Sequence, residues 1–314
     1  DYCSAMALLF KTDIDRGTAW AQAFAKHAPD LELRQWPEIG NPDDIEYVLV
    51  WAPPEGVLSR LPNLKAIFSV GAGIDHLMAA GELPEGIPIV RMVEPGLTAG
   101  MTEFVVMASL MLHRFMLEYR SQQTAHHWEE INQIPTARRR VGILGLGTLG
   151  QESARVLSTF GFPVAGWSRS RKTIPGIDSF AGETELKAFL NRSDLLVCLL
   201  PLTPETESIL NRETLAQLPK GALLVSAGRG RQVDEDALLE ALDSGQIGGA
   251  VLDVFRQEPL PAESPFWDHP KVILPPHVAS MTNPETAVLA VLDNIARIKK
   301  GDAPSHTVDL KRGY

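Results

Sequence analysis

The sequence has 314 residues, of which 45% are hydrophobic and 22% are charged. This length and composition predict a globular chain of two domains and argue against a disordered one. Its 29 basic and 39 acidic side chains leave a formal net charge of -10. That charge argues against general nucleic-acid binding, which needs a basic surface.

Cysteine content and hydropathy bear on the location of the protein in the cell. The two cysteines, Cys3 and Cys198, make neither a disulfide framework nor a metal site. We therefore expect no bound metal and a reducing compartment, the cytoplasm. No apolar run approaches the ~18 residues that a membrane span needs, so we expect no membrane association.

The first hundred residues alternate short apolar runs with helical patterns. Strands are expected at 6–10, 47–51 and 65–70, and a helix at 18–28. Repeated strand–helix units predict a parallel sheet with helices on its faces.

A long helix is expected at about 102–120, with Thr102 as its cap. Its apolar residues cover nearly the whole circumference, which is typical of a helix buried between domains or subunits. The polar stretch 125–140 that follows predicts a linker.

A second strand–helix series begins at Val141. The expected strands are 141–144, 163–168, 194–200, 221–227, 248–255 and 272–277. The expected helices are 149–160, 183–190, 234–245 and 284–300. The chain therefore belongs to the α/β class, with doubly wound parallel sheets of the Rossmann type.

Glycines at the first turn of this second series predict a phosphate site. GLGTLG at 145–150 has the G-x-G-x-x-G spacing, follows a strand and opens a helix. Such glycines let the backbone approach a pyrophosphate, and the helix N-terminus supplies N–H donors. The alternative is a plain strand–helix turn. The residues predicted to contact the cofactor here are Gly145, Gly147, Thr148, Leu149 and Gly150.

The end of the next strand predicts which dinucleotide binds. NAD-binding units usually place a carboxylate there for the ribose 2′-hydroxyl, but no carboxylate lies between Glu152 and Asp178. A hydroxyl and three cations stand there instead, and arginine suits a 2′-phosphate. We predict a preference for NADP(H), with NAD(H) as the alternative cofactor and a solvated basic loop as the alternative reading. The predicted contacts are Ser168, Arg169, Arg171 and Lys172.

Three ionisable residues follow later strands and form the candidate catalytic set: Arg229, Glu258 and His277. Ligands of doubly wound sheets bind beyond the carboxyl ends of the strands, where all three are expected. Each alone is as easily a surface or structural residue. Together they suit the reduction of a 2-oxo acid: Arg229 would bind the carboxylate and His277 would donate a proton to the carbonyl oxygen. Glu258 would hydrogen-bond the other imidazole nitrogen and favour the imidazolium.

With these segments in place, the sequence resembles the D-2-hydroxyacid dehydrogenase family over nearly its whole length. The matching motifs, in the family's order, are SVGAGIDHL (69–77), GLGTLG (145–150), LPLTPET (200–206), SAGRG (226–230), LDVFRQEPL (252–260) and PPHVAS (275–280). It is most similar to the branch of bacterial A-type NADPH-dependent glyoxylate/hydroxypyruvate reductases. WAPP (51–54), WSRSRK (167–172), SFAG (179–182) and LPAESPFWDHP (260–270) support that branch.

The resemblance implies a fold of two domains and a homodimer formed through the long helix. A flavodoxin-like substrate domain would comprise 1–101 and 282–314, and an NAD(P)-binding Rossmann domain 102–281. It implies the same catalytic set, and backbone N–H groups of Ala72 and Gly73 that bind the substrate carboxylate beside Arg229. Trp51 would line the substrate pocket, although a tryptophan at a strand end is more often in the core. Further cofactor contacts would come from Leu200, Pro201, Thr206, Ala227 and Asp253, the last holding the nicotinamide carboxamide.

The leading hypothesis is therefore an NADPH-dependent reductase of small 2-oxo acids, glyoxylate or hydroxypyruvate, that works by hydride transfer. One alternative is an NAD-linked member of the same family, of the phosphoglycerate type. Another is a dinucleotide-sensing protein without catalysis, a role that would not require the complete set of Arg229, Glu258 and His277.

Overall fold

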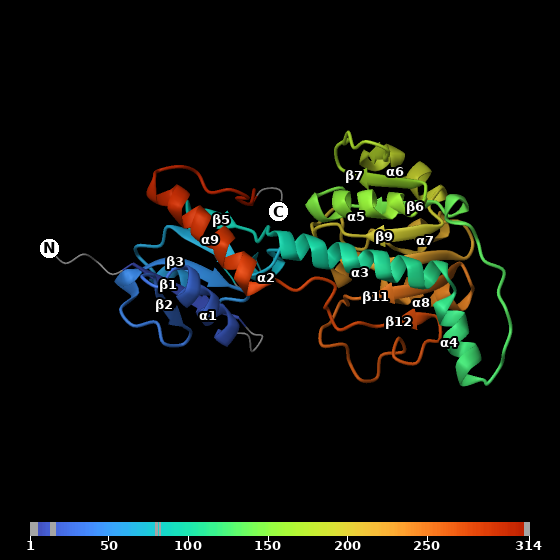
Figure 1. Ribbon diagram of the computed structural model, residues 1–314, viewed down its shortest axis with the longest axis horizontal. Helices are drawn as coiled ribbons and strands as arrows, with labels where there is room; N and C mark the ends of the chain where they lie inside the picture. Colours follow the sequence, from blue (N-terminus) through green and yellow to red (C-terminus); the bar gives the residue numbers. More distant parts are fainter. Residues whose placement is uncertain (1–5, 13–16, 79–80, 82, 311–314) are drawn as a thin grey trace. The chain divides into compact units, whose positions relative to one another are not determined.

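The computed structural model describes residues 6–12, 17–78, 81 and 83–310, so Cys3 lies outside the described residues. The chain divides into two compact units (Figure 1). Unit 1 comprises Asp1–Leu97 and Met281–Tyr314, and unit 2 comprises Thr98–Ser280. The boundaries expected from the sequence were 101/102 and 281/282.

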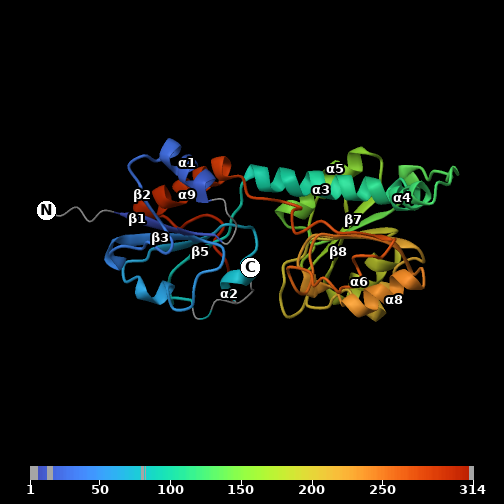
Figure 2. The same ribbon diagram turned by 90° about the horizontal axis from the view of Figure 1, so that it is seen from below.

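Unit 1 is built on a parallel sheet in the order β2-β1-β3-β4-β5, the flavodoxin-like order. The strands are β1 (Ala7–Lys11), β2 (Glu32–Gln35), β3 (Ile45–Val50), β4 (Ala66–Ser69) and β5 (Ile89–Val90). Helices α1 (Gly17–His27) and α9 (Pro284–Lys299) cover one face, and the short α2 (Asp75–Met78) lies on the other (Figure 2). The inner strands are buried on both faces, which explains their continuous apolar runs.

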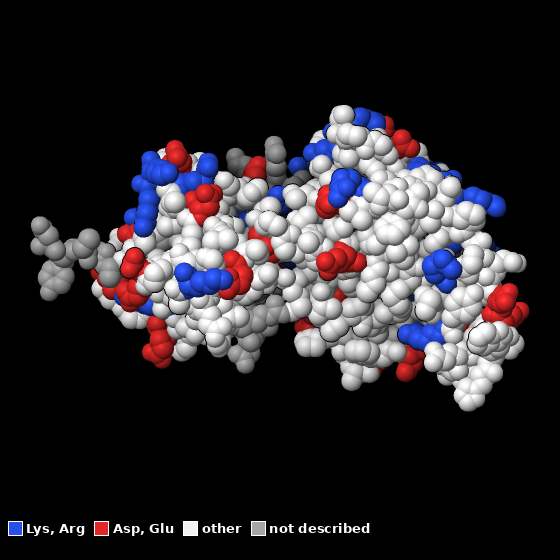
Figure 3. Space-filling model, in the orientation of Figure 1, with Lys and Arg blue, Asp and Glu red and all other residues white. Residues whose placement is uncertain are grey.

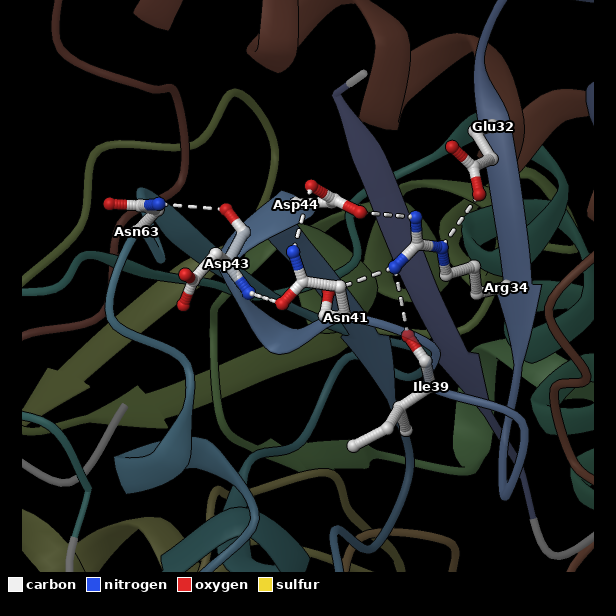
Figure 4. A network of polar contacts seen from close by, with 7 residues as sticks. All are labelled: Glu32, Arg34, Ile39, Asn41, Asp43, Asp44 and Asn63. Carbon is white, nitrogen blue, oxygen red and sulfur yellow. Dashed lines mark hydrogen bonds and ion pairs between the residues drawn. The ribbon is translucent and has the colours of Figure 1, made fainter. Parts of the chain in front are cut away.

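The guanidinium of Arg34, in β2, closes the loop that follows this strand (Figure 4). Arg34 donates to the carboxylates of Glu32, at 2.7 Å, and Asp44, at 2.8 Å. It also donates to the carbonyls of Ile39 and Asn41, each at 2.9 Å. The hydrogen bonds with the two carboxylates raise the pKa of Arg34 above its ordinary value. This network orders an edge of unit 1 that contains none of the predicted site residues.

Unit 2 is built on a parallel sheet in the order β12-β11-β10-β9-β6-β7-β8. The strands are β6 (Val141–Leu144), β7 (Val164–Ser168), β8 (Asp178–Ala181), β9 (Leu195–Cys198), β10 (Ala222–Ser226), β11 (Ile247–Leu252) and β12 (Val272–Ile273). The helices are α3 (Pro95–His113), α4 (Met116–Thr124), α5 (Thr148–Thr159), α6 (Gly182–Asn191), α7 (Arg212–Ala216) and α8 (Glu235–Asp243). Figure 2 shows α3 and α5 on one face of the sheet and α6 and α8 on the other. Each face has its own apolar core. The two sheets confirm the predicted α/β class.

The helix expected at 102–120 is wrong at both ends. It begins earlier, as α3 at Pro95, and stops at His113. The left-handed backbone of Phe115, with φ of 60°, separates it from α4. One side of α3 packs into the core of unit 2 through Phe104, Val105 and Ala108.

By length and hydropathy alone, α3 also qualifies as a candidate membrane span, contrary to the sequence expectation. A buried core helix meets the same criteria, and 44% of the apolar window is buried. On the face drawn in Figure 3, acidic and basic side chains are interspersed rather than gathered into one basic patch.

Three short edge or near-edge strands were not expected from the sequence. β2 and β8 read ELRQ and DSFA, without an apolar run, and β5 has only two residues. β12 is shorter than expected, because it ends at Ile273 before the two prolines. Strands at edges gain less from burial, so hydrophobic pattern does not reveal them.

Candidate active site

The glycines after β6 have the roles that a dinucleotide turn requires. Gly145 has φ of +103°, and a Cβ there would lie 2.8 Å from the Leu199 carbonyl oxygen. A Cβ on Gly150 would lie 1.8 Å from the Gly145 carbonyl oxygen, so only glycine lets α5 pack this close. Gly147 is the N-cap of α5 and faces open space. The N-terminus of α5 is therefore accessible to a phosphate group, which it would attract.

The basic segment after β7 contains two arginines, one of which forms an ion pair with α6. Arg171 donates to the Ser179 carbonyl and to the Glu185 carboxylate, so protein groups already neutralise much of its charge. Arg169 is exposed, and its charge is one of the causes that lower the pKa of Glu205, after hydrogen bonds from Thr203 and from the backbone. Lys172 is also exposed. The hydroxyl of Ser168 donates to the carbonyl of Ser170 at 2.8 Å.

The loop after β9 is held by the side chain that was predicted to contact the cofactor. The Thr206 hydroxyl donates to the Pro201 carbonyl at 2.7 Å and accepts from the Thr203 N–H at 2.8 Å. Thr206 and Leu200 are both buried. Thr206 therefore shapes this loop, and its contact with a cofactor stays a prediction.

Arg229 lies beyond the end of β10, between two glycines that close packing requires. A Cβ on Gly230 would lie 1.8 Å from the Phe255 backbone carbon, and one on Gly228 would lie 2.9 Å from the Leu200 carbonyl oxygen. The segment after β10 is thus pressed against the segments that follow β9 and β11. The position of Arg229 is set by this backbone packing, while Ala227 before it is buried.

The buried amide of Gln232, a residue not predicted from the sequence, supports Arg229. Its side chain is 0% exposed. Its Oε1 accepts from the Arg229 N–H at 2.9 Å, and its Nε2 donates to the Leu200 carbonyl at 2.6 Å. Gln232 thereby joins the carboxyl ends of β9 and β10. Only its spacing, three residues after Arg229, would have signalled it.

Glu258 and His277 form a hydrogen-bonded pair. His277 Nδ1 lies 2.7 Å from Glu258 Oε2, and Glu258 Oε1 accepts from the Phe255 N–H at 2.9 Å. The two side chains are 37% and 35% exposed, so the pair is open to solvent on one side. His277 has the left-handed backbone φ of 54°, a conformation that residues with a Cβ rarely adopt outside constrained sites.

A buried carboxylate holds the loop that carries His277. Asp253 is 1% exposed and accepts from the N–H groups of Val278, at 2.8 Å, and Ala279, at 3.0 Å. Its carbonyl accepts from the His277 N–H at 2.9 Å. Burial raises the pKa of Asp253 above its ordinary value, against the effect of the two N–H donors. Its predicted bond to a nicotinamide carboxamide stays a prediction.

The structure brings together all three members of the candidate catalytic set. Arg229, Glu258 and His277 follow β10, β11 and β12, which are neighbours in the sheet. Burial raises the pKa of Glu258, but bonds from His277 and the Phe255 N–H, with the charges of His277 and Arg229, outweigh it. The pKa of Glu258 therefore lies below its ordinary value, and the carboxylate is ionised at neutral pH.

The turn predicted to bind the substrate carboxylate beside Arg229 lies in unit 1, after β4. The Trp51 ring stacks on His76 at a centroid distance of 3.9 Å, and a Cβ on Gly71 would lie 2.7 Å from that indole. Trp51 thus lies against the turn 71–73, which contains Ala72 and Gly73. His76 was missed by the sequence analysis. The approach of this turn to Arg229, which belongs to unit 2, stays a prediction.

This arrangement defines a class of protein. A glycine turn that fits a dinucleotide shares one sheet edge with an arginine and a carboxylate–histidine pair, as in an NAD(P)-dependent oxidoreductase. Among the described residues, no group of three or more His, Cys, Asp or Glu side chains is placed to hold a metal ion.

Comparison with known proteins identifies the family. Residues 106–279 match the D-isomer specific 2-hydroxyacid dehydrogenase NAD binding domain. A dehydrogenase of Xanthobacter autotrophicus Py2, solved with NADPH and MES, is 40% identical, with 99% of this chain and 100% of that chain covered and a TM-score of 0.95. An NADPH-dependent glyoxylate/hydroxypyruvate reductase of Sinorhizobium meliloti, solved with NADP and sulfate, is 38% identical, with 98% and 100% covered and a TM-score of 0.94. The chain belongs to the D-isomer specific 2-hydroxyacid dehydrogenase family, which confirms the resemblance seen in the sequence.

The depressed pKa of Glu258 predicts how stability changes with pH. Because the folded-state pKa lies below the ordinary 4.5, ionised Glu258 contributes stability that is complete above that value and is lost as the pH falls through the folded-state pKa. Urea unfolding of the wild type and Glu258→Gln should therefore show a difference in free energy that narrows below pH ~4.5. Glu183→Gln, at an exposed position on α6, is the control. A gap that widens on acidification contradicts the prediction.

Proposed function

We propose that the protein is an NADPH-dependent reductase of small 2-oxo acids, with glyoxylate and hydroxypyruvate as its substrates. The observation that carries this proposal is the Glu258–His277 pair, which shares one sheet edge with Arg229 and with the glycine turn. The relative from Sinorhizobium meliloti is a glyoxylate/hydroxypyruvate reductase by name and supports the substrate class.

The hydrogen bond between Glu258 and His277 determines which imidazole nitrogen reacts. Because Nδ1 faces the Glu258 carboxylate, Nε2 is the nitrogen left for a substrate oxygen. Protonated His277 donates its Nε2 proton to the carbonyl oxygen of the oxo acid and becomes neutral imidazole. Glu258 stabilises the imidazolium that precedes this transfer, and the reverse reaction returns the proton to His277.

Arg229 and the turn 71–73 orient the substrate in this proposal. The Arg229 guanidinium pairs with the substrate carboxylate, and N–H groups of the turn complete its binding. The chemistry that NADPH would supply when bound is the hydride for the carbonyl carbon. The glycine turn and the N-terminus of α5 would hold the pyrophosphate of NADPH, and Arg169 would pair with its 2′-phosphate. The relatives from Xanthobacter autotrophicus and Sinorhizobium meliloti were solved with NADPH and NADP, respectively, which supports this cofactor.

We also propose that the protein works as a homodimer in the cytoplasm. Apolar side chains are exposed along α3 and beyond it: Met107 is 46% exposed, Met116 45% and Trp128 95%. Large apolar side chains exposed in this way are common at protein interfaces. Cys198 is a buried free thiol whose pKa burial raises to about 12, as suits a reducing compartment.

Activity measurements test the proposed reaction. The wild type should oxidise NADPH with glyoxylate or hydroxypyruvate. His277→Gln should lower kcat about 100-fold or more, because the proton donor is lost, while NADPH binding persists. Arg229→Lys should mainly raise KM for the oxo acid, because lysine lacks the bidentate fork. NADPH binding without turnover of any small 2-oxo acid would reject the reductase and favour a dinucleotide sensor.

A substitution at Arg169 tests the proposed origin of the cofactor preference. Arg169→Ala should lower kcat/KM for NADPH about tenfold relative to NADH, because a charge-assisted contact to the 2′-phosphate is lost. Arg171→Ala is the matched control and should change this ratio less, since Glu185 already pairs with that guanidinium. Equal kinetics with NADPH and NADH in the wild type would instead support the NAD-linked alternative.

The oligomeric state is measured by sedimentation equilibrium. We expect the mass of two chains for the wild type. The double variant Met107→Glu and Met116→Glu should give one chain, because buried charges oppose association. Leu289→Glu, an equally exposed apolar position on α9, should remain dimeric. A monomeric wild type at micromolar concentration contradicts the dimer.

A further inference from the structure

The chain passes between the two units twice. One buried carboxylate in unit 1 accepts hydrogen bonds from residues beside both connections. The first connection lies in α3, after Leu97, and the second lies before Met281. Glu94 immediately precedes α3 and is 2% exposed, the most buried carboxylate described in unit 1. Neither the proposed reaction nor the candidate catalytic set uses it.

Glu94 binds the N-termini of two helices. Its Oε2 accepts from the Gly96 N–H in the first turn of α3 at 2.6 Å. The same atom accepts from the Thr286 hydroxyl in the first turn of α9 at 2.6 Å, and Oε1 accepts from the Asn283 N–H at 3.4 Å. A carboxylate is favoured at a helix N-terminus by the orphan N–H groups and the helix dipole. One side chain therefore stabilises both helices that adjoin the connections.

Two glycines let the connections run side by side. A Cβ on Gly96 would lie 3.0 and 3.2 Å from the two Glu94 carboxylate oxygens and 3.4 Å from Asn283 Cβ. Four residues further along α3, a Cβ on Gly100 would lie 3.2 Å from the Ser280 hydroxyl. Gly96 and Gly100 share one face of the helix. The close contact of the two connections thus extends over one turn of α3.

The segments that Glu94 joins also hold the turn predicted to bind the substrate carboxylate. The Thr282 hydroxyl, next to Asn283, donates to the Val70 carbonyl at 2.7 Å. The Met92 N–H, two residues before Glu94, donates to the Gly71 carbonyl at 3.1 Å. The carbonyls at the start of the turn 71–73 are fixed in this way.

The same connection carries His277 at its other end. Asp253 holds Val278 and Ala279, and three residues later Thr282 and Asn283 are held by Val70 and Glu94. The loop 277–283 is thus fixed at both ends through buried carboxylates, one in each unit. Short loops fixed at both ends have few conformations left to adopt.

From these contacts we infer that Glu94 is a positioning residue for the reduction of the oxo acid. It fixes the backbone at Gly96 and Asn283. Through these segments it restricts the conformations of the loop 277–283 and the turn 71–73. Glu94 touches neither the substrate nor the cofactor in this role, which rests on the proposed function. When the Glu94 carboxylate is removed, the oxo acid is bound less productively. The glycine turn 145–150 and the Glu258–His277 pair, both within unit 2, are unaffected.

The test is Glu94→Gln, which keeps the shape but puts an N–H₂ group where one of the donors needs an acceptor. We expect kcat/KM for glyoxylate to fall about tenfold or more, chiefly through a higher KM. The NADPH dissociation constant, the number of NADPH sites per chain and the pH profile of kcat should stay as in the wild type. A merely unstable protein would instead lose NADPH sites, with KM unchanged in the fraction that remains folded.

Two further variants make the result specific. Gly96→Ala retains the carboxylate but crowds it, and it should reproduce the Glu94→Gln phenotype. Glu285→Gln is the matched control: this glutamate is also in the first turn of α9, but it pairs with Lys26 and His27 at the surface. Its kinetics should equal those of the wild type.

Hydrogen exchange gives a readout that does not depend on turnover. In Glu94→Gln, amides of the turn 71–73 and of 280–286 should exchange faster than in the wild type, whereas those of the turn 145–150 should not. Unchanged kinetics and unchanged exchange in Glu94→Gln overturn the inference. A wild type without activity on any oxo acid rejects the proposed function, and exchange then decides whether Glu94 holds the two segments at all.

Discussion

The candidate site depends on the parallel pairing of β10, β11 and β12, which places the ends of three strands side by side. Each strand end supplies one ionisable group. The backbone after β10 lies so close to Phe255 that only glycine is accommodated at position 230. This contact fixes the Arg229 segment against the loop that holds Glu258. The electrostatic coupling of the guanidinium, the carboxylate and the imidazole follows from that backbone packing.

The supporting residues explain how a polar site remains ordered. Gln232 joins β9 to β10, and Asp253 joins β11 to the loop that carries His277. Both are buried with hydrogen bonds to backbone groups, the condition under which a polar side chain is tolerated in a core. His277 can adopt its left-handed backbone because neighbouring N–H groups are held on the Asp253 carboxylate. Glu258 and His277 are held by these buried neighbours and still remain partly open to solvent.

The sequence alone was sufficient to predict the fold class and the glycine and ionisable residues that follow the strands, for a physical reason. Buried parallel strands are continuous apolar runs, and glycine or charge directly after such a run stands out. The glycine turn, Arg229, Glu258 and His277 are all of this kind. Gln232, His76 and Glu94 were missed because each has a partner far along the chain: the Leu200 carbonyl, the Trp51 ring and the Thr286 hydroxyl, respectively. The start of α3 was misplaced because its first turn, Pro95 to Thr98, contains little of the apolar pattern that reveals the rest of the helix.

The ion pair between Arg171 and Glu185 has a consequence for redesign of the protein. It secures the segment after β7 to the start of α6 through Arg171, two residues from Arg169. An engineer who wished to convert the protein to the cheaper, unphosphorylated coenzyme could therefore introduce a carboxylate at position 169 and leave the fastening at 171 intact. Under the proposed function, recognition of the 2′-phosphate and the ion pair to α6 belong to different arginines, two residues apart.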